Sequence, residues 1–281
     1  MPSTSDPLTP RIDQAEFRNV PGRSGVELYR AHIVQNAFEP HTHQAYGLGV
    51  IESGVERFRY GGTDHLATPQ SIVMMQPDML HTGRAETASG WRYRMLYIDA
   101  TMVSELSGET HWSFDEVVEP RRHELAQRLV LLHHRLWLCG DPLEADGLLL
   151  AFMTSLRPLA HTGSRVLRDG ASARLDPVVD YMRAFLQERI LLADLAAVAG
   201  LSPFHFLRKF KARYHVTPHQ MLMALRLFAA KQMLARHVRP AEVAAATGLT
   251  DQAHLTRAFA GRYGVTPARY QRQVNPSRTD A

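Results

Sequence analysis

Three histidines in the first hundred residues are of a type that could hold a metal ion. His41 and His43 are separated by one residue in Pro40-His41-Thr42-His43, and His81 follows the turn-like stretch that begins at Pro77. Three neutral imidazoles with one open coordination position could bind Zn²⁺, as three-histidine sites do. The same side chains could equally line a cavity and form hydrogen bonds there without metal. Our main expectation is no cofactor, with Zn²⁺ or another divalent metal as the alternative.

A second set of side chains with recognisable chemistry lies in the last eighty residues. Arginine can pair with the two acceptors of guanine, glutamine can pair with adenine, and lysine suits phosphate. Two short segments present such groups beside apolar residues at helical spacing. We therefore expect DNA contacts from Phe204, His205, Arg208 and Lys209 in the first segment, and from Gln252, His254, Thr256 and Arg257 in the second.

These two segments belong to an internal repeat. Residues 194–201 return 48 positions later as residues 242–249, and the residues after them return at a spacing of 49. Each copy starts as a short Ala-rich helix that ends at a glycine, which accepts the left-handed backbone of a sharp helix stop. Ser202 and Thr250 come next, each able to cap the following helix. A helix, a tight turn and a second helix, written twice, predict a tandem helix-turn-helix domain whose second helices enter the major groove.

Apolar stripes indicate how the second helix of each unit packs. Residues at i, i+4 and i+8 share one helix face, which should lie on the supporting helix. The DNA-contacting residues lie largely off these faces, so we expect them to be exposed. The stripes are Phe206, Phe210 and Tyr214 in the first unit, and Leu255, Phe259 and Tyr263 in the second.

The charge of the chain is uneven. Residues 174–281 contain 16 Lys and Arg against 7 Asp and Glu, a net charge of +9, although the whole chain of 281 residues carries only +4. A basic domain attracts phosphate polymers or anionic membrane surfaces. The single cysteine, Cys139, excludes a disulfide within the chain and suits a reducing compartment. The sequence lacks a signal peptide and an apolar run of roughly 18 residues, so we expect a cytoplasmic protein without membrane contact.

Residues 176–274 resemble the DNA-binding domain of AraC/XylS-type regulators. The resemblance implies seven helices, with a linker helix over about residues 218–237 between the two units. It assigns Phe204, His205 and Arg208 to the first recognition helix, and Gln252, His254 and Arg257 to the second. Leu207 departs from the pattern, because a polar base-reading residue often stands there. The motif is carried most closely by Ala244-Ala245, Gly248-Leu249, His254-Leu255-Thr256-Arg257-Ala258-Phe259, Tyr263-Gly264-Val265-Thr266-Pro267 and Tyr270.

The N-terminal part shows a different pattern of apolar residues. Short apolar runs alternate with turn signals from Val26 to about Asp99, which predicts a β-sandwich or barrel. Helical spacing follows over residues 121–139 and 142–160, and the short break between them predicts an antiparallel pair of helices. The strand-like runs are residues 47–51, 56–60, 71–75 and 93–98.

The His-x-His pair and the later histidine also resemble the cupin pattern of the sensing domains in the same family. Cupin enzymes add a glutamate to the metal site, but its position falls near Gly47, which offers no ligand. The resemblance implies a small effector inside the barrel and dimerisation through the helices that follow. The expected effector pocket comprises His41, His43, Tyr46, Arg57, His81 and Trp91. The expected dimer surface comprises Leu125, Leu129, Leu132 and Leu136, which could equally pack on their own barrel.

The predicted fold class is α+β with two domains: a cupin-like β-barrel with an antiparallel helix pair, then an all-α domain with two helix-turn-helix units. The expected boundaries are a flexible tail at 1–20, the effector-binding and dimerisation domain at 21–160, a linker at 161–173, the DNA-binding domain at 174–275 and a tail at 276–281.

The predicted function is sequence-specific regulation of transcription, with activation the commoner role in this family. The expected partners are double-stranded DNA, a small effector, a second copy of the chain and RNA polymerase. Two other classes stay open: a metal-binding cupin enzyme or metal-dependent sensor with an accessory helical domain, and a helical adaptor whose basic surface binds acidic proteins. We expect no catalysis, because a pocket in the N-terminal domain is already explained by the binding of an effector that controls the attached DNA-binding domain.

Overall fold

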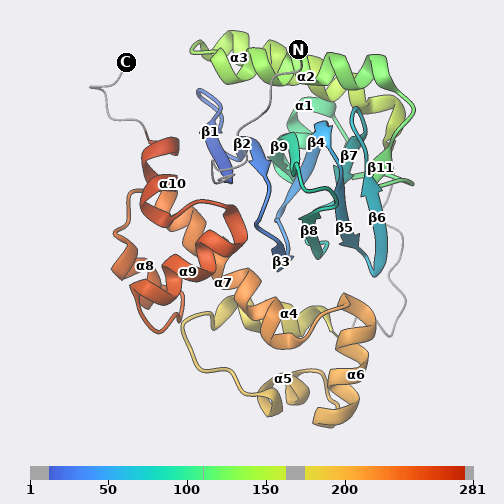
Figure 1. Cartoon of the computed structure of the whole chain (residues 1–281). Coiled ribbons are helices and arrows are strands. Elements are labelled where there is room, and N and C mark those ends of the chain that lie inside the picture. Colours follow the sequence, from blue (N-terminus) through green and yellow to red (C-terminus); the bar gives the residue numbers. More distant parts are fainter. Residues whose placement is uncertain (1–12, 110, 163–174, 276–281) are drawn as a thin grey trace.

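The computed structural model describes residues 13–109, 111–162 and 175–275. Its N-terminal half contains two antiparallel sheets that face each other (Figure 1). The larger sheet has the strand order β1-β2-β9-β4-β7-β11, and the smaller one β3-β8-β5-β6. The predicted β-rich half is confirmed; its strands form a two-sheet sandwich in the part of the chain described. The strands are β1 Gln14–Asn19, β2 Val26–Ile33, β3 Phe38–His41, β4 Ala45–Gly54, β5 Glu56–Tyr60, β6 Thr63–Ala67, β7 Ile72–Met75, β8 His81–Ala85, β9 Trp91–Asp99 and β11 Val118–Glu119.

The larger sheet is buried on both faces. Its outer face packs on α1 Ala100–Ser107, α2 His123–Leu138 and α3 Pro142–Leu156. Because successive side chains of a strand point to opposite faces, β9 turns Leu96 toward these helices and Met95 toward the interior of the sandwich. Strands covered on both sides need apolar residues at nearly every position. This double burial explains the continuous apolar runs that marked β4 and β9 in the sequence.

The C-terminal half is helical, as the repeat predicts. It has seven helices, α4 to α10, in the described residues, and the predicted linker helix is α7. The first unit has its own apolar core around Phe206 and Phe210, whereas the core of the second unit is continuous with the interior of the sandwich. The helices are α4 Asp176–Ala184, α5 Leu192–Val198, α6 Pro203–Tyr214, α7 Pro218–Ala235, α8 Pro240–Ala246, α9 Gln252–Tyr263 and α10 Pro267–Val274.

Two of the predicted boundaries need correction. Residues 14–19, expected in a flexible tail, form β1, which pairs along its whole length with β2 and buries Ala15 and Phe17. A six-residue strand with alternating polar and apolar side chains gives a weak signal beside a Pro-rich start. His161–Thr162, expected at the start of the linker, forms the short strand β12, paired with β10 Trp112–Ser113. The remaining tail and linker segments, 1–12, 163–174 and 276–281, lie outside the described residues.

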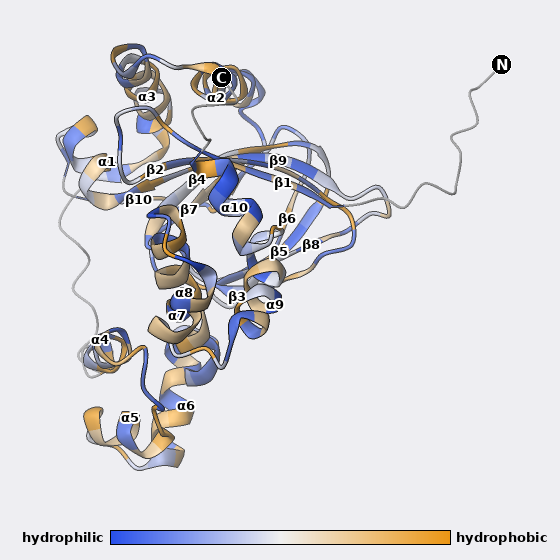
Figure 2. Cartoon of the chain, turned by 90° about the vertical axis from the view of Figure 1, so that its left-hand side faces the viewer, coloured by the Kyte–Doolittle hydropathy of each residue, from blue (hydrophilic) through white to orange (hydrophobic). Residues whose placement is uncertain are grey.

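Figure 2 shows the arrangement from the side: α2 and α3 above, the strands in the middle with α10 beside them, and α4 to α9 below. The second helix-turn-helix unit lies against the sandwich through α9 and α10, while α5 and α6 lie farthest from it (Figures 1 and 2). Within the described segments, no helix has both the length and the apolar character required to cross a bilayer.

Candidate DNA-binding and effector sites

The turns and caps of the two helix-turn-helix units are formed as the repeat predicts, with one difference. Gly200 and Gly248 adopt left-handed φ values of 64° and 68°. A Cβ atom at Gly248 would lie 2.4 Å from the carbonyl oxygen of Leu186, so this turn requires glycine for space as well. Ser202 caps α6 as expected, but α9 is capped by Asp251, not Thr250. The Asp251 carboxylate accepts a 2.6 Å hydrogen bond from the His254 backbone nitrogen, a stronger cap than a neutral hydroxyl provides.

The apolar stripes and the predicted DNA-contacting residues separate onto different faces of α6 and α9. Phe206, Phe210, Leu255 and Phe259 are fully buried. Phe204, His205, Arg208 and Lys209 on α6 are exposed, as are Gln252 and Arg257 on α9. His254 and Thr256 are half-buried, and the Thr256 hydroxyl donates to the Gln252 carbonyl of its own helix at 2.8 Å. Both arginines are therefore free to approach a nucleic acid, while Thr256 has less to offer than the sequence suggested.

The exposed face of α9 borders the N-terminal domain. A cleft of about 510 Å³ has Asn36 and Glu39 from around β3 on one side, and His254 and Arg257 of α9 on the other. The side chain of Asn36 donates to the Gly261 carbonyl near the end of α9 at 3.3 Å. The face of α9 that carries Arg257 therefore lies beside the N-terminal domain, a neighbour that the sequence did not indicate.

The interior of the sandwich encloses a small cavity of about 40 Å³. His41 comes from the end of β3, His81 from the start of β8, and His43 from the loop that leads into β4. Their ring centroids are 4.2 to 5.1 Å apart, so the three predicted histidines converge. The other lining residues are Phe17, Tyr29, Phe38, Glu56, Val73, Met75, Thr82, Tyr93, Met95, Tyr97, Arg262 and Tyr263.

Burial controls the protonation of the cavity side chains. Desolvation lowers the pKa of His41 and His43 well below the usual range and lowers that of His81 to about 4, with the positive charge of Arg262 acting in the same direction. Desolvation also raises the pKa of the Glu56 carboxyl to about 8. At neutral pH the cavity therefore holds neutral imidazoles and a largely protonated carboxyl group.

Three of the six predicted pocket residues do not line this cavity. Tyr46 points to the opposite face of β4, where its hydroxyl donates to the Trp112 carbonyl at 3.0 Å. Arg57 lies on the outer side of β5 and pairs with Glu86 at 2.7 Å. Trp91 is buried in the interior cluster, stacked on Tyr93, but it stands behind the cavity wall. Strand alternation fixes which residues share a face, but it does not say which face is the interior.

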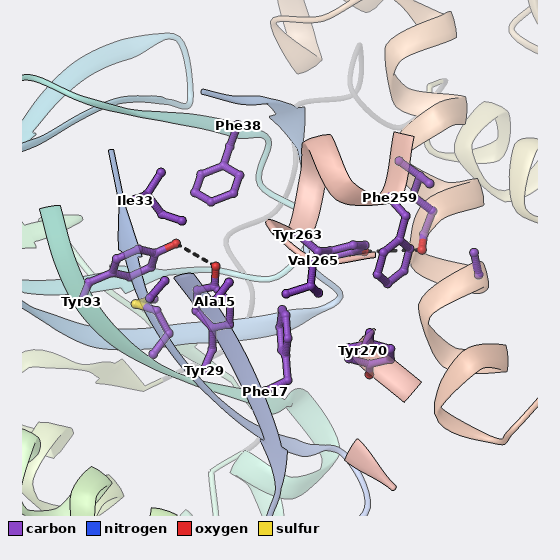
Figure 3. Packing of buried hydrophobic residues seen from close by; sticks show 14 of the residues in the cluster. Ala15, Phe17, Tyr29, Ile33, Phe38, Tyr93, Phe259, Tyr263, Val265 and Tyr270 are labelled. Carbon is purple, nitrogen blue, oxygen red and sulfur yellow. Dashed lines mark hydrogen bonds between the residues drawn. The ribbon is translucent and has the colours of Figure 1, made fainter. Parts of the chain in front are cut away.

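The second helix-turn-helix unit closes one side of the interior. Phe17 of β1 lies between the unit and Tyr29 of β2, with ring centroids 5.2 Å from Tyr270 and 6.4 Å from Tyr263 (Figure 3). The buried Lys231 of α7 forms an ion pair with Glu27 of β2. The Tyr270 hydroxyl also donates to this carboxylate at 2.9 Å. An aromatic contact and a buried charge therefore join two segments that are more than two hundred residues apart in the sequence.

Arg262, near the end of α9, connects the unit to the three histidines. It is 5% exposed. Its guanidinium donates to the Ala224 carbonyl of α7 at 2.7 Å and to the carbonyl of Thr42, which stands between His41 and His43. Arg262 was not among the predicted site residues. Its position three residues after the apolar Phe259 was the available sign that it faces inward.

The predicted dimer leucines pack within their own chain. Leu129, Leu132 and Leu136 are at most 8% exposed and belong to the core between α2 and the larger sheet, and Leu125 packs against the same cluster. A helical apolar stripe does not reveal whether its partner is the same chain or another. The leucines that these helices leave exposed are Leu131, Leu138, Leu143 and Leu150.

Comparison with known families matches both halves of the chain. A family described as "AraC-like ligand binding domain" matches residues 23–153, and a "Helix-turn-helix domain" matches residues 195–273. The MmsAB operon regulatory protein of Pseudomonas aeruginosa is 37% identical over 223 residues, which cover 72% of this chain and 66% of that protein. The uncharacterised HTH-type transcriptional regulator YbfI of Bacillus subtilis is 26% identical over 237 residues, covering 82% of this chain and 86% of its own length.

The arrangement of both halves also occurs in a solved structure. Apo ToxT from Vibrio cholerae superimposes with a TM-score of 0.60 over 91% of this chain and 100% of that one. The two sequences are only 10% identical, so this likeness concerns the fold.

Proposed function

This chain belongs to the AraC family of transcriptional regulators, and we propose that it reads DNA with α6 and α9 under the control of an effector in the interior of its sandwich. The main support for this proposal is the pair of helix-turn-helix units. Each unit has an exposed arginine, Arg208 or Arg257, on a different helix face from its buried apolar stripe. Two such helices on one linker helix suit successive major grooves, about 34 Å apart. The target of one chain would then span roughly two turns of duplex.

The base-reading role of Arg257 is tested by Arg257→Ala. Arginine bidentate to guanine discriminates between bases, so the variant should lose preference at one base position, at a loss of about 1–3 kcal/mol in binding free energy. The measurement is competition binding to a duplex that the unmodified protein selects from a random library, and to versions of it changed at each position.

The matched control is Arg269→Ala, which removes an exposed arginine from α10 rather than from a reading helix. It should leave the preference at every position unchanged. If Arg257→Ala distinguishes the selected duplex from a scrambled one as well as the unmodified protein does, Arg257 is not a base-reading residue.

The control of DNA binding is inferred from how the interior is closed. Arg262 and Tyr263 of α9 form part of the cavity wall, so a group bound there would touch the same helix that carries Arg257. An effector can favour one placement of α9 over another. The resulting shift in DNA affinity is limited by how much more tightly the effector binds one placement than the other. ToxT has also been solved bound to an unsaturated fatty acid, with 12% identity to this chain and a TM-score of 0.53. We infer regulation rather than catalysis, and activation as the commoner role in the family.

A homodimer is proposed through α2 and α3. Leu131 and Leu138 are seven residues apart on α2, as are Leu143 and Leu150 on α3, so each helix presents one pair of leucines on one face. Their exposed fractions range from 49% to 81%. The two helices pack against each other (Figure 1). Leu138 and Leu143 stand on either side of the short connection, and Leu131 and Leu150 each lie seven residues farther from it, so the pairs are equally spaced from the connection along the chain. Exposed apolar surface of this kind is typical of an interaction site.

Replacing Leu131 and Leu138 by glutamine should convert the dimer into a monomer, because it removes apolar area from the centre of the proposed interface without disturbing the buried side of α2. Molar mass from light scattering after gel filtration measures the change. Leu66→Gln, at a leucine of β6 that is 47% exposed, is the control and should stay dimeric. A monomeric unmodified protein, or a double variant that dimerises equally well, would contradict the proposed surface.

A further inference from the structure

The three cavity histidines bring together ring nitrogens that have lone pairs to share. One nitrogen from each of His41, His43 and His81 lies within 4.8 Å of the other two. The Nδ1 atoms of His41 and His81 lie 2.7 and 3.0 Å from the carbonyl oxygens of Glu39 and Met79. A carbonyl oxygen can only accept, so each Nδ1 carries the proton and each Nε2 keeps its lone pair. Nε2 of His43 is buried without a hydrogen-bond partner in the described part of the chain.

This arrangement suits a metal ion better than the other occupants that fit. A ring nitrogen that donates to a backbone carbonyl, while the other faces a shared centre, is the usual support of a metal-bound histidine. Pockets for organic ligands are commonly about 300–1,000 Å³, whereas this cavity holds about 40 Å³, enough for an ion and a water molecule. A single water molecule can donate only two hydrogen bonds, whereas three neutral imidazoles offer three lone pairs to accept them.

We propose that His41, His43 and His81 bind one divalent transition-metal ion, with Zn²⁺ as the ion we commit to. Three imidazoles with an open fourth position form a known class of zinc site, and nitrogen ligands disfavour Mg²⁺ and Ca²⁺. Three titratable groups bear on the site from other elements. Arg262 of α9 and Lys231 of α7 oppose a cation, and Glu56 of β5, largely protonated at neutral pH, lies in the same cavity wall. The nitrogens must draw closer than in the present geometry to meet Zn–N distances of about 2.0–2.1 Å.

Hydrogen bonds of Arg262 connect the site to the DNA-reading helix α9. The Thr42 carbonyl, between two of the ligands, accepts from Arg262, which in turn donates to the Ala224 carbonyl of α7. Drawing His41 and His43 inward would move this carbonyl and therefore the last turn of α9. This consequence rests on the proposed function, because it treats the metal ion as the effector. The binding of a metal ion by the three histidines does not depend on the proposed function.

Metal binding is tested with the full chain, freed of metal by a chelator and dialysed against Zn²⁺. The unmodified protein should take up one ion per chain, and His43→Gln and His81→Gln should lose this uptake while keeping the near-ultraviolet circular dichroism of a packed core. His134→Gln changes an exposed histidine of α2 and should keep the ion. A protein that takes up no Zn²⁺, or variants that retain it, would overturn the proposal.

X-ray absorption at the zinc edge of the unmodified protein gives a second measurement that does not depend on how the variants fold. Three imidazole ligands are expected; a sulfur ligand, or oxygen ligands without imidazole, would refute the site. The effector role is then measured as the affinity for the selected duplex with and without Zn²⁺, where we expect a change of about 5- to 150-fold that His134→Gln keeps and His43→Gln loses. Stoichiometric zinc with unchanged DNA affinity would support the metal site and reject its role as effector. Protein that selects no duplex, either with or without Zn²⁺, would instead reject the proposed function.

Discussion

Replacing Lys231 by methionine should lower the free energy of unfolding by about 3–5 kcal/mol, because it leaves a buried carboxylate without its counter-ion. Lys231 and Glu27 have side chains only 11% and 15% exposed. Burial lowers the pKa of Lys231, and the neighbouring Glu27 charge opposes that shift and keeps the ammonium group protonated. Methionine has a similar length and would keep the apolar contacts of the side chain. The measurement is urea denaturation, followed by fluorescence.

The double variant Lys231→Met with Glu27→Gln separates the charge effect from a loss of packing. Exchanging both members of a buried pair for neutral groups is often close to neutral in stability, so the double variant should recover most of the loss. Arg239→Met is the control for an exposed pair: Arg239 and Glu242 are 81% and 51% exposed, and solvent screens such pairs, so this variant should be about as stable as the unmodified protein. A double variant as unstable as Lys231→Met would contradict the ion-pair explanation.

Lys231 also shows how the two halves form one structure. Its ammonium group lies 4.5 Å from the ring centroid of Phe17 and 4.9 Å from that of Tyr263. Phe17 comes from the sandwich and Tyr263 from α9, so a single cation lies among aromatic rings of both halves. A cation over aromatic rings is attracted more strongly when water is excluded. Any change in the docking of the second helix-turn-helix unit must therefore disturb this site.

The sequence predicted those features that repeat or alternate locally. The tandem units followed from a repeat that includes Arg208 and Arg257, and these residues are exposed as expected. Leu129 and Leu136 were placed correctly on one apolar stripe, but the sequence left open whether that stripe packs on the sheet of its own chain or on a second chain, because it suits either; the structure places it against the sheet. Tyr46 was assigned to the wrong side of β4 for a related reason: a strand buried on both faces has no polar side to identify the interior.

The contacts between the halves could not be predicted from local patterns. Lys231 follows Ala229-Ala230 and precedes Gln232 in its helix, and a lysine in a helix is most often a surface residue. Its partner Glu27 lies 204 positions earlier in the chain. Only the folded chain brings them together, and the same holds for the contact between Arg262 and Thr42.

The contribution of Glu56 to stability should decline as the pH rises from about 4.5 to about 8, and Glu56→Gln should remove most of this decline. In the unfolded chain the Glu56 carboxyl loses its proton near its ordinary pKa of 4.5, whereas burial raises the folded pKa to about 8. The folded state then holds a proton that the unfolded state has released, so stability is full below pH 4.5 and is lost as the pH rises through the folded pKa. At about 1.36 kcal/mol for each pKa unit, the decline would be on the order of 5 kcal/mol.

The decline is isolated by comparing urea denaturation of the two proteins at several pH values between 5 and 8, without metal. Buried His81 and His133, with pKa values lowered to about 4 and about 3, act in the opposite direction, since they remove stability as the pH falls below 6.5. Both proteins share that loss, so the difference between them reports Glu56 alone. Glu116→Gln, at an exposed loop position, should follow the unmodified protein. If the difference in stability between Glu56→Gln and the unmodified protein is the same at pH 5 and pH 8, the carboxyl is charged in the folded state, and the electrostatic description of the cavity is wrong.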